Sequence, residues 1–209
     1  MAKNIVISSL NVRGLRDFKK RREVFHYFQK AEAEILFLQE AHCTAEIEKQ
    51  WRAEWGYTIL FSHGTSDSRG VCILFKNTFY LDIHDVLSDP EGRYIIADVT
   101  IGSKRLSLVN IYGPNQDKPL FFENMISLVE GIPNDEKIVG GDFNFVLDID
   151  KDKRGGNPHT HAKAQAVVTA WMEDTDLIDI WRIQNPDKFR FTWYTNNPNA
   201  IFCRLDFFL

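Results

Sequence analysis

Short runs of apolar and β-branched residues alternate along the chain with stretches in which apolar residues recur at helical spacing. Side chains repeat every two residues in a strand and about every 3.6 residues in a helix, so the two patterns predict different elements. The predicted strands are Ile5–Ser9, Glu34–Gln39, Tyr57–Phe61, Val71–Phe75, Tyr94–Ile101, Leu106–Tyr112, Lys137–Val139, Phe189–Tyr194 and Ile201–Leu209. The predicted helices are Lys19–Ala31, Thr44 to Gly56, Asp117 to Gly131 and Ala162–Met172.

Residues at the ends of these segments support the assignment. Thr44 can cap a helix that Gly56 ends, and Asp117 with Pro119 can open another. Because hairpins are mixed with helical crossovers, we expect an α/β fold with mixed sheets. The aromatic residues at helical spacing are interpreted as core: Phe25, Phe28, Trp51, Trp55 and Trp171.

Composition narrows the class of protein. The 209 residues are enough for one buried domain, with 44% hydrophobic and 26% charged residues, as in ordinary soluble proteins. The apolar runs are too short to cross a bilayer, and no signal-peptide pattern follows Met1. The three cysteines are scattered, which predicts neither a disulfide framework nor a zinc site. We therefore expect a reducing compartment and no membrane partner.

The charge distribution is uneven. A net charge of −4 argues against indiscriminate binding of nucleic acids. Two basic clusters nevertheless occur, and each could be either a solvated surface or a set of phosphate contacts. The first contains Arg13, Arg16, Lys19, Lys20, Arg21 and Arg22, and the second contains Lys151, Lys153 and Arg154.

Polar side chains follow four of the predicted strands where each strand ends. They are Asn11, Gln39-Glu40, Tyr112 with Asn115, and Asp142 with Asn144. Ligands bind beyond the carboxyl ends of strands in sheets of this kind, so we expect these side chains to converge on one rim. Acids gathered there need a cation or a proton between them. Oxygen ligands without thiolates favour magnesium over zinc.

Each motif also has a simpler interpretation when it is taken alone. Gly-Gly-Asp-Phe-Asn and Tyr-Gly-Pro-Asn are both compatible with ordinary turns, and Gln39-Glu40 could merely solvate a strand end. The joint occurrence of all of them, in order, on successive strand ends favours a shared site.

Six segments together resemble the ordered motif set of the exonuclease–endonuclease–phosphatase superfamily, which includes apurinic endonucleases, exonuclease III and DNase I. The segments are SLNVRGLR, LFLQEAH, RGVCILF, VNIYGPN, GGDFN and CRLDFFL, and they span Leu10 to Asp206. The resemblance implies a single DNase I-like domain over residues 1–209. Its fold would be a four-layer α/β sandwich in which two mixed sheets pack face to face and are flanked by helices.

The resemblance also implies a role for each residue of the rim. Glu40 would hold the metal, which is Mg²⁺ with Mn²⁺ able to replace it. Asp142 would orient or deprotonate the attacking water, with Asn144 fixing the geometry. The remaining roles are phosphate binding by Asn11, Tyr112 and Asn115, and orientation of a catalytic histidine by Asp206.

Four segments resemble LINE-type retrotransposon endonucleases more than repair enzymes: LQEAH, DPEGRYIIADVTI, DLIDIWR and FTWYTNNP. This implies an endonuclease that nicks double-stranded DNA and leaves a 3′-hydroxyl, the primer for target-primed reverse transcription. The partner would be the reverse transcriptase domain of the same polyprotein. Such a domain is expected to be monomeric in isolation and to work in the nucleus after synthesis in the cytoplasm.

Two other functions remain open. One is an apurinic-site endonuclease or an exonuclease III-like repair enzyme. The other is a DNA-binding module without catalysis, because the chain ends at Leu209, before the family's Ser-Asp-His segment. On this ground the chain by itself is expected to be poorly active, and its six histidines, including His159 and His161, are not expected to replace the missing one.

DNA contacts are predicted in two places. Arg13 occupies a position where many superfamily members carry an acid or an amide, so we expect it to contact a phosphate or an acid instead. The turn from Thr195 to Asn199 is rich in amides and could read a groove, although an ordinary hairpin turn is the alternative. The residues assigned to DNA in this region are Thr192, Asn196 and Asn197.

Overall fold

The computed structural model describes residues 4–134, 136–157, 161–196 and 199–209. These residues form two compact units. Unit 1 comprises Met1–Tyr112 and Asn134–Gly141, and unit 2 comprises Gly113–Pro133 and Asp142–Leu209. In the described parts of the chain, no helix is both long and apolar enough to cross a membrane.

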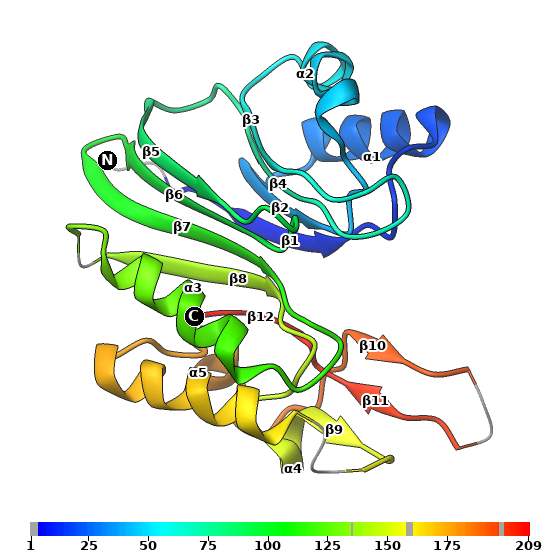
Figure 1. Ribbon diagram of the computed structural model, residues 1–209, viewed down its shortest axis with the longest axis vertical. Helices are drawn as coiled ribbons and strands as arrows, with labels where there is room; N and C mark the ends of the chain where they lie inside the picture. The colour runs from blue at the N-terminus through cyan, green and yellow to red at the C-terminus, as the bar shows by residue number, and fades with distance from the viewer. Residues whose placement is uncertain (1–3, 135, 158–160, 197–198) are drawn as a thin grey trace. The chain divides into compact units, whose positions relative to one another are not determined.

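Unit 1 contains two sheets (Figure 1). The strands of the first sheet follow one another in the order β1-β2-β4-β3. They are β1 (Ile7–Asn11), β2 (Ile35–Gln39), β3 (Ile59–Ser62) and β4 (Val71–Phe75). The second sheet contains β5 (Leu81–Ser88), β6 (Tyr94–Ile101), β7 (Lys104–Tyr112) and β8 (Lys137–Asp142), the last residue of which already belongs to unit 2.

Helices cover the outer face of the first sheet (Figure 1). They are α1 (Phe18–Lys30), the short 3-10 turn η1 (Ala45–Ile47) and α2 (Glu48–Trp55). Phe25, Trp51 and Trp55 are almost fully buried between these helices and the sheet. On the other face, β2 and β4 contact β7, and β3 and β4 contact β6. Every residue of β2 and β4 is buried because both faces of the sheet are covered.

Unit 2 is built on a helix pair and a small sheet. The helices are α3 (Pro119–Glu130), α4 (Ile149–Asp152), α5 (Ala162–Thr175) and α6 (Ile180–Gln184), and α3 packs against α5. The small sheet has the order β10-β11-β9 and consists of β9 (Lys153–Arg154), β10 (Trp193–Tyr194) and β11 (Phe202–Cys203). The strand β12 (Asp206–Phe208) follows β11.

Most predicted elements of unit 1 are confirmed, with three differences. Thr44 does not cap α2: it precedes only the 3-10 turn η1, and its side chain makes no capping hydrogen bond. The first strand lies two residues further along than the predicted Ile5–Ser9, so Asn11 is its last residue. The strand β5 was not predicted, because Asp82, His84 and Asp85 interrupt its apolar pattern. Polar residues of this kind are typical of strands at the edge of a sheet, and β5 is the last strand in the order given for its sheet.

The predictions for unit 2 need more correction. Asp117 does not cap α3 but accepts hydrogen bonds from Lys163 N and Ala164 N, at 3.2 and 2.8 Å, and so caps α5. The predicted strand Ile201–Leu209 is divided, because Arg204 N donates to Asp152 O between β11 and β12. The short helices α4 and α6 were not predicted.

Candidate active site

Asn11 and Glu40 lie together at the carboxyl ends of two neighbouring strands. The strands β1 and β2 are parallel, with Asn11 opposite Gln39, so both chains leave the sheet at the same edge. The side-chain Nδ2 of Asn11 donates a hydrogen bond of 2.7 Å to Oε1 of Glu40. This part of the predicted rim is therefore present as an amide–carboxylate pair.

The backbone on either side fixes this pair. Val12 N, Gly14 N and Leu15 N donate to the carbonyl oxygens of residues 39, 40 and 41, at 2.9, 2.7 and 3.0 Å. Glu40 itself has a positive φ of 50°, which turns its side chain out of the buried strand. A non-glycine residue in this region is strained, and such strain is tolerated where the surrounding structure determines it. Gln39, in contrast, is fully buried and donates to Asn110 Oδ1 at 2.7 Å, so it belongs to the core.

The chemistry of this corner suits a hard cation. Magnesium in proteins keeps several waters and is held by one or two carboxylates together with phosphate oxygens of the substrate. Glu40 supplies one partly buried carboxylate whose orientation is set by Asn11. Within the described ranges, no group of three or more His, Cys, Asp or Glu side chains could hold a metal by itself. The single carboxylate of Glu40 fits an ion that shares its coordination with water and substrate.

Tyr112 ends β7 beside a cation that the sequence did not reveal. Tyr112 is 7% exposed, and its backbone N donates to Arg93 O at 2.7 Å. The guanidinium carbon of Arg93 lies 5.4 Å from the centre of the Tyr112 ring. Burial lowers the pKa of Arg93 from its ordinary value, although an arginine remains charged at neutral pH. The positive charge of Arg93 lies beside the phenol ring and can attract a negatively charged group that binds there.

Asp142 and Asn144 form a second corner, in unit 2. Asp142 is 6% exposed, and its Oδ1 accepts a hydrogen bond of 3.0 Å from Asn144 N. Asn144 has a positive φ of 58°, and its Nδ2 donates to Gly113 O at 2.7 Å. Gly113 N donates to Asp142 O at 2.7 Å, which closes the set. A side chain on Gly113 would meet Phe143 O at 2.2 Å, so this close approach requires glycine.

The backbone of Asp206 is hydrogen-bonded to the side chain of Thr192. Leu205 N and Asp206 N donate to Thr192 Oγ1 at 3.0 and 3.2 Å. Phe143 N donates to Leu205 O at 2.9 Å, which attaches the segment before Asp206 to the residue after Asp142. Thr192 therefore has a structural role besides the predicted DNA contact, and its hydroxyl hydrogen can still donate.

The residues of the predicted rim are thus divided between the two units, and we call each group a corner. Unit 1 carries Asn11, Arg13, Glu40 and Tyr112, and unit 2 carries Asp142, Asn144, Asn115, Asp206, Thr192 and Asn196. Hydrogen bonds join Asn11 to Glu40 in unit 1, and Asp142 to Asn144 and Thr192 to Asp206 in unit 2, and Asn115 is exposed in the loop before α3. Asn197 lies outside the described residues.

A family model for the endonuclease/exonuclease/phosphatase family matches residues 8–209, which is nearly the whole chain. The chain belongs to this family. The superfamily predicted from the motifs is therefore confirmed.

A curated relative of this family member is an uncharacterized 149 kDa protein of transposon TX1 from Xenopus laevis. The two sequences are 33% identical over 190 residues, which are 90% of this chain and 14% of the relative. The chain thus spans only a small part of the length of that protein.

Solved structures of the family share the fold. An apurinic endonuclease from Leishmania major superposes with a TM-score of 0.74 and 19% identity, covering 98% of this chain and 77% of the other. The endonuclease domain of TRAS1, a telomere-specific non-LTR retrotransposon, gives a TM-score of 0.64 and 14% identity, with 98% and 84% covered. The predicted DNase I-like fold, with two mixed sheets and flanking helices, is confirmed by these matches.

The first basic cluster of this family member is only partly available for DNA. Arg21 is 2% exposed and forms two hydrogen bonds with the carboxylate of Glu54, at 2.6 and 2.8 Å. Its hydrogen bond is the main reason why the pKa of Glu54 lies below its ordinary value. Lys20 Nζ donates to Val12 O at 2.7 Å. The interpretation of the whole cluster as phosphate contacts is wrong for Arg21, which is structural.

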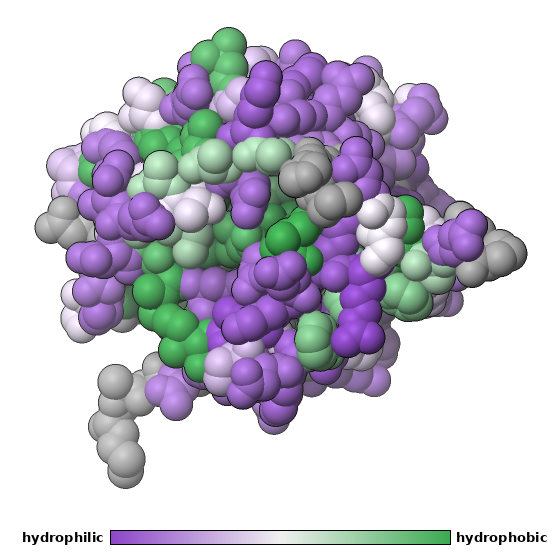
Figure 2. Space-filling view, turned by 90° about the horizontal axis from the view of Figure 1, so that it is seen from below, coloured by the Kyte–Doolittle hydropathy of each residue, from purple (hydrophilic) through white to green (hydrophobic). Residues whose placement is uncertain are grey.

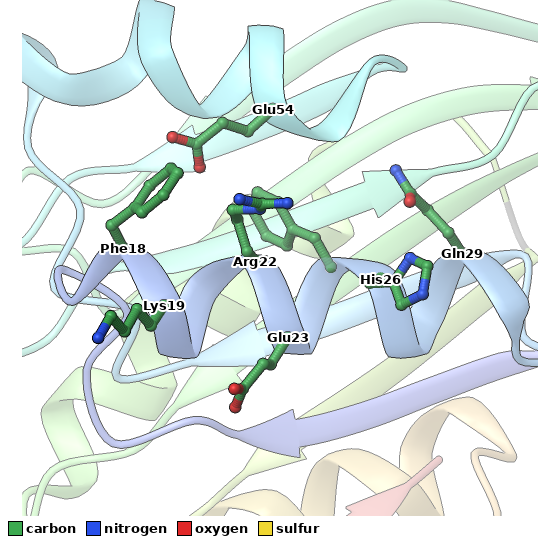
Figure 3. A pocket seen from close by; sticks show the side chains of 8 residues that line it. Phe18, Lys19, Arg22, Glu23, His26, Gln29 and Glu54 are labelled. Carbon is green, nitrogen blue, oxygen red and sulfur yellow. The ribbon is translucent and has the colours of Figure 1, made fainter.

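The other members of that cluster are exposed. Lys19 and Arg22 lie along α1 at the groove between this helix and α2, which has a volume of about 470 Å³ (Figure 3). Arg13 is exposed, and its backbone N donates to Asn11 Oδ1 at 3.1 Å. Arg13 is thereby held next to the Asn11–Glu40 corner, where it can meet an anionic ligand.

His159 and His161 were both expected to be exposed loop residues. His159 is outside the described residues. His161 is instead partly buried at the start of α5, with a positive φ of 64°.

Proposed function

We propose that this chain is the Mg²⁺-dependent endonuclease domain of a LINE-type retrotransposon and that it nicks double-stranded DNA to leave a 3′-hydroxyl. The hydrogen bond between Asn11 and Glu40 carries the enzymatic part, because it places one oriented carboxylate where two parallel strands end. The relation to a transposon protein at 33% identity supports the biological part.

The chain's residues divide the reaction among themselves. Asp142 accepts a proton from the water that attacks the phosphorus atom, while Asn144 N holds the carboxylate of Asp142 in place. Asn11, Asn115 and Tyr112 bind the non-bridging phosphate oxygens and stabilise the charge that develops on them. Glu40 would hold a magnesium ion, which would supply Lewis-acid stabilisation of the phosphate. The bond between phosphorus and the 3′ oxygen breaks, and that oxygen takes a proton from solvent water to become the 3′-hydroxyl.

In this scheme Asp206 would orient the imidazole of a histidine that is not among residues 1–209. Its backbone is fixed by Thr192 Oγ1, and the preceding residue is fixed by Phe143 N. The position of Asp206 therefore depends on the segment that also carries Asp142.

The larger setting follows from the same proposal. The TX1 relative is far longer than this chain, which leaves room for a polymerase in the same polyprotein. The nick would prime reverse transcription by that domain, and the site of action would be the nucleus. As an isolated domain the chain would be monomeric.

A repair function is the second candidate, because the fold superposes on an apurinic endonuclease with a TM-score of 0.74. The test uses the full-length protein that contains this chain and compares its nicking of an intact duplex with its nicking of the same duplex carrying one abasic site, in Mg²⁺ and in EDTA. We expect Mg²⁺-dependent nicking of the intact duplex at a rate comparable to that of the abasic duplex. Strict dependence on the abasic site would favour repair, and binding without turnover in any metal would favour a DNA-binding module.

A further inference from the structure

A row of side chains crosses the small sheet of unit 2. Tyr194 on β10 is paired with Phe202 on β11, and Phe202 is paired with Arg154 on β9. Directly paired residues of antiparallel strands place their side chains on the same face. The rings of Tyr194 and Phe202 are stacked, with their centres 6.1 Å apart and their planes at 28°.

Neighbouring residues extend this row. The guanidinium carbon of Arg154 lies 4.3 Å from the centre of the Phe189 ring, and the ring of Phe191 lies 5.6 Å from that of Phe202. We call Tyr194, Phe202, Arg154 and Phe189 the aromatic row.

The aromatic row faces solvent within its unit. The next residue pairs along the same strands are Trp193 with Cys203 and Cys203 with Lys153, and their side chains lie on the opposite face. Cys203 is 6% exposed. The opposite face is therefore the inner face of the sheet. In contrast, Tyr194 is 60% exposed, Phe189 52% and Phe202 36%. Figure 2 shows apolar surface beside strongly hydrophilic surface at the projecting end of the molecule that carries β10 and β11.

The charge around the aromatic row is mainly positive. Arg154, Lys188 and Arg190 are exposed in the strand and loop that border it, and Asp150 and Asp187 are exposed acids nearby in sequence. Aromatic rings beside guanidinium and ammonium groups match the two parts of a nucleotide, since a base stacks on a ring and a phosphate pairs with a cation. Grouped exposed aromatic residues of this size mark binding surfaces more often than single ones do.

We propose that the aromatic row is a stacking surface for an unpaired base of the DNA, with Arg154 contacting the adjacent phosphate. This inference rests on the proposed function for its ligand, DNA, and adds a preference for duplex whose stacking is broken beside the nick. Tyr194 and Phe202 carry the base contact, because both rings are exposed and lie next to each other on paired strands.

The experiment measures binding to two fluorescein-labelled duplexes of equal length in EDTA, one fully paired and one with a single unpaired adenine. Unmodified protein should bind the second duplex several-fold more tightly. Tyr194→Ala with Phe202→Ala should remove this several-fold preference, because the stacked base loses its support. Tyr194→Phe should keep the preference, because a phenyl ring still stacks.

A matched control is Tyr80→Ala, since Tyr80 is 63% exposed in unit 1 and outside the aromatic row. Circular dichroism and thermal unfolding establish that the variants are folded. Equal binding of both duplexes by the unmodified protein, or a preference unchanged in the folded double variant, overturns the proposal. Absence of Mg²⁺-dependent nicking by the unmodified protein together with an intact binding preference would overturn the proposed function and leave the stacking surface standing, so failure of the two proposals can be told apart.

Discussion

The side-chain amide of Asn11 holds the carboxylate of Glu40 at 2.7 Å, across two strands that are far apart in sequence but adjacent in the sheet. The pair exists because β1 and β2 are parallel and end in register. A carboxylate oriented in this way loses little freedom when it binds a cation.

Asn11→Ala should weaken metal binding rather than abolish it. Partners that orient a metal ligand typically change metal affinity about 10- to 100-fold when they are removed. The Mg²⁺ concentration for half-maximal nicking should therefore rise by at least about 10-fold. Asn77→Ala is the control, since Asn77 is exposed elsewhere in unit 1. An unchanged Mg²⁺ requirement in Asn11→Ala would show that the pair does not tune the metal site.

Arg204→Met should destabilise the protein strongly. Arg204 is 3% exposed and donates to both carboxylate oxygens of Asp152, at 2.7 and 2.8 Å, and also to Asp179. Removal leaves two buried carboxylates short of a partner, which costs on the order of 3–5 kcal/mol. Denaturant unfolding measures the difference, and a loss below about 1 kcal/mol would contradict a structural role.

The loss of folding stability in Arg204→Met should depend on pH. Burial acts to raise the pKa of Asp152, but hydrogen bonds and charge interactions with Arg204 and Arg182 outweigh it and leave the pKa below its ordinary value. Such a group stabilises the fold above the ordinary aspartate pKa of about 3.9 and loses that contribution as the pH falls through its folded value. The gap between Arg204→Met and the unmodified protein should therefore be constant near neutrality and narrow below about pH 4.

Target preference should reside in the turn from Asn196 to Asn199. Thr195 is left in place because its Oγ1 accepts from Ile201 N at 2.9 Å and so closes the hairpin. Replacing Asn196–Asn199 by Gly-Ser repeats should flatten the distribution of nick sites more than it slows nicking. Sequencing of nicked ends provides the readout, and an identical pattern would exclude the turn as the reader.

Affinity that is independent of sequence should come from the exposed basic residues. Arg13→Gln with Arg22→Gln should weaken binding to all duplexes alike and reduce the slope of log affinity against log salt by about 2. Arg21→Gln serves as the contrast, because Arg21 is buried against Glu54 and its loss should lower stability instead. A salt slope that stays the same in the double variant would remove these residues from the DNA surface.

The sequence predicted most of unit 1 well because its central strands are mostly buried and read as apolar runs, as in β2 and β4. Val71–Phe75 and Tyr94–Ile101 were predicted with the bounds that the structure has. The site residues at strand ends were predictable for the same reason, since motif and strand end coincide at Asn11, Glu40 and Asp142.

Unit 2 was less predictable because long-range polar contacts shape it. The break at Arg204 depends on Asp152 and Asp179, which lie 52 and 25 residues away. Asp117 caps a helix that begins 45 residues later, whereas capping patterns in a sequence are read over three or four residues.

In unit 1, the contact of Arg93 with Tyr112 likewise depends on a long-range arrangement, the pairing of β6 with β7.

The central claim is that Asp142 activates water for a magnesium-dependent nick. The most direct measurement is the rate of relaxation of supercoiled plasmid by the full-length protein that contains this chain, compared with its Asp142→Asn variant, in Mg²⁺ and in EDTA. Asparagine keeps the size of the side chain and one oxygen for the hydrogen bond from Asn144 N, but it cannot accept the proton. We expect no nicking in EDTA and a loss of at least about 100-fold in the variant at unchanged DNA affinity. Nicking by Asp142→Asn within a few-fold of the unmodified rate would contradict the account.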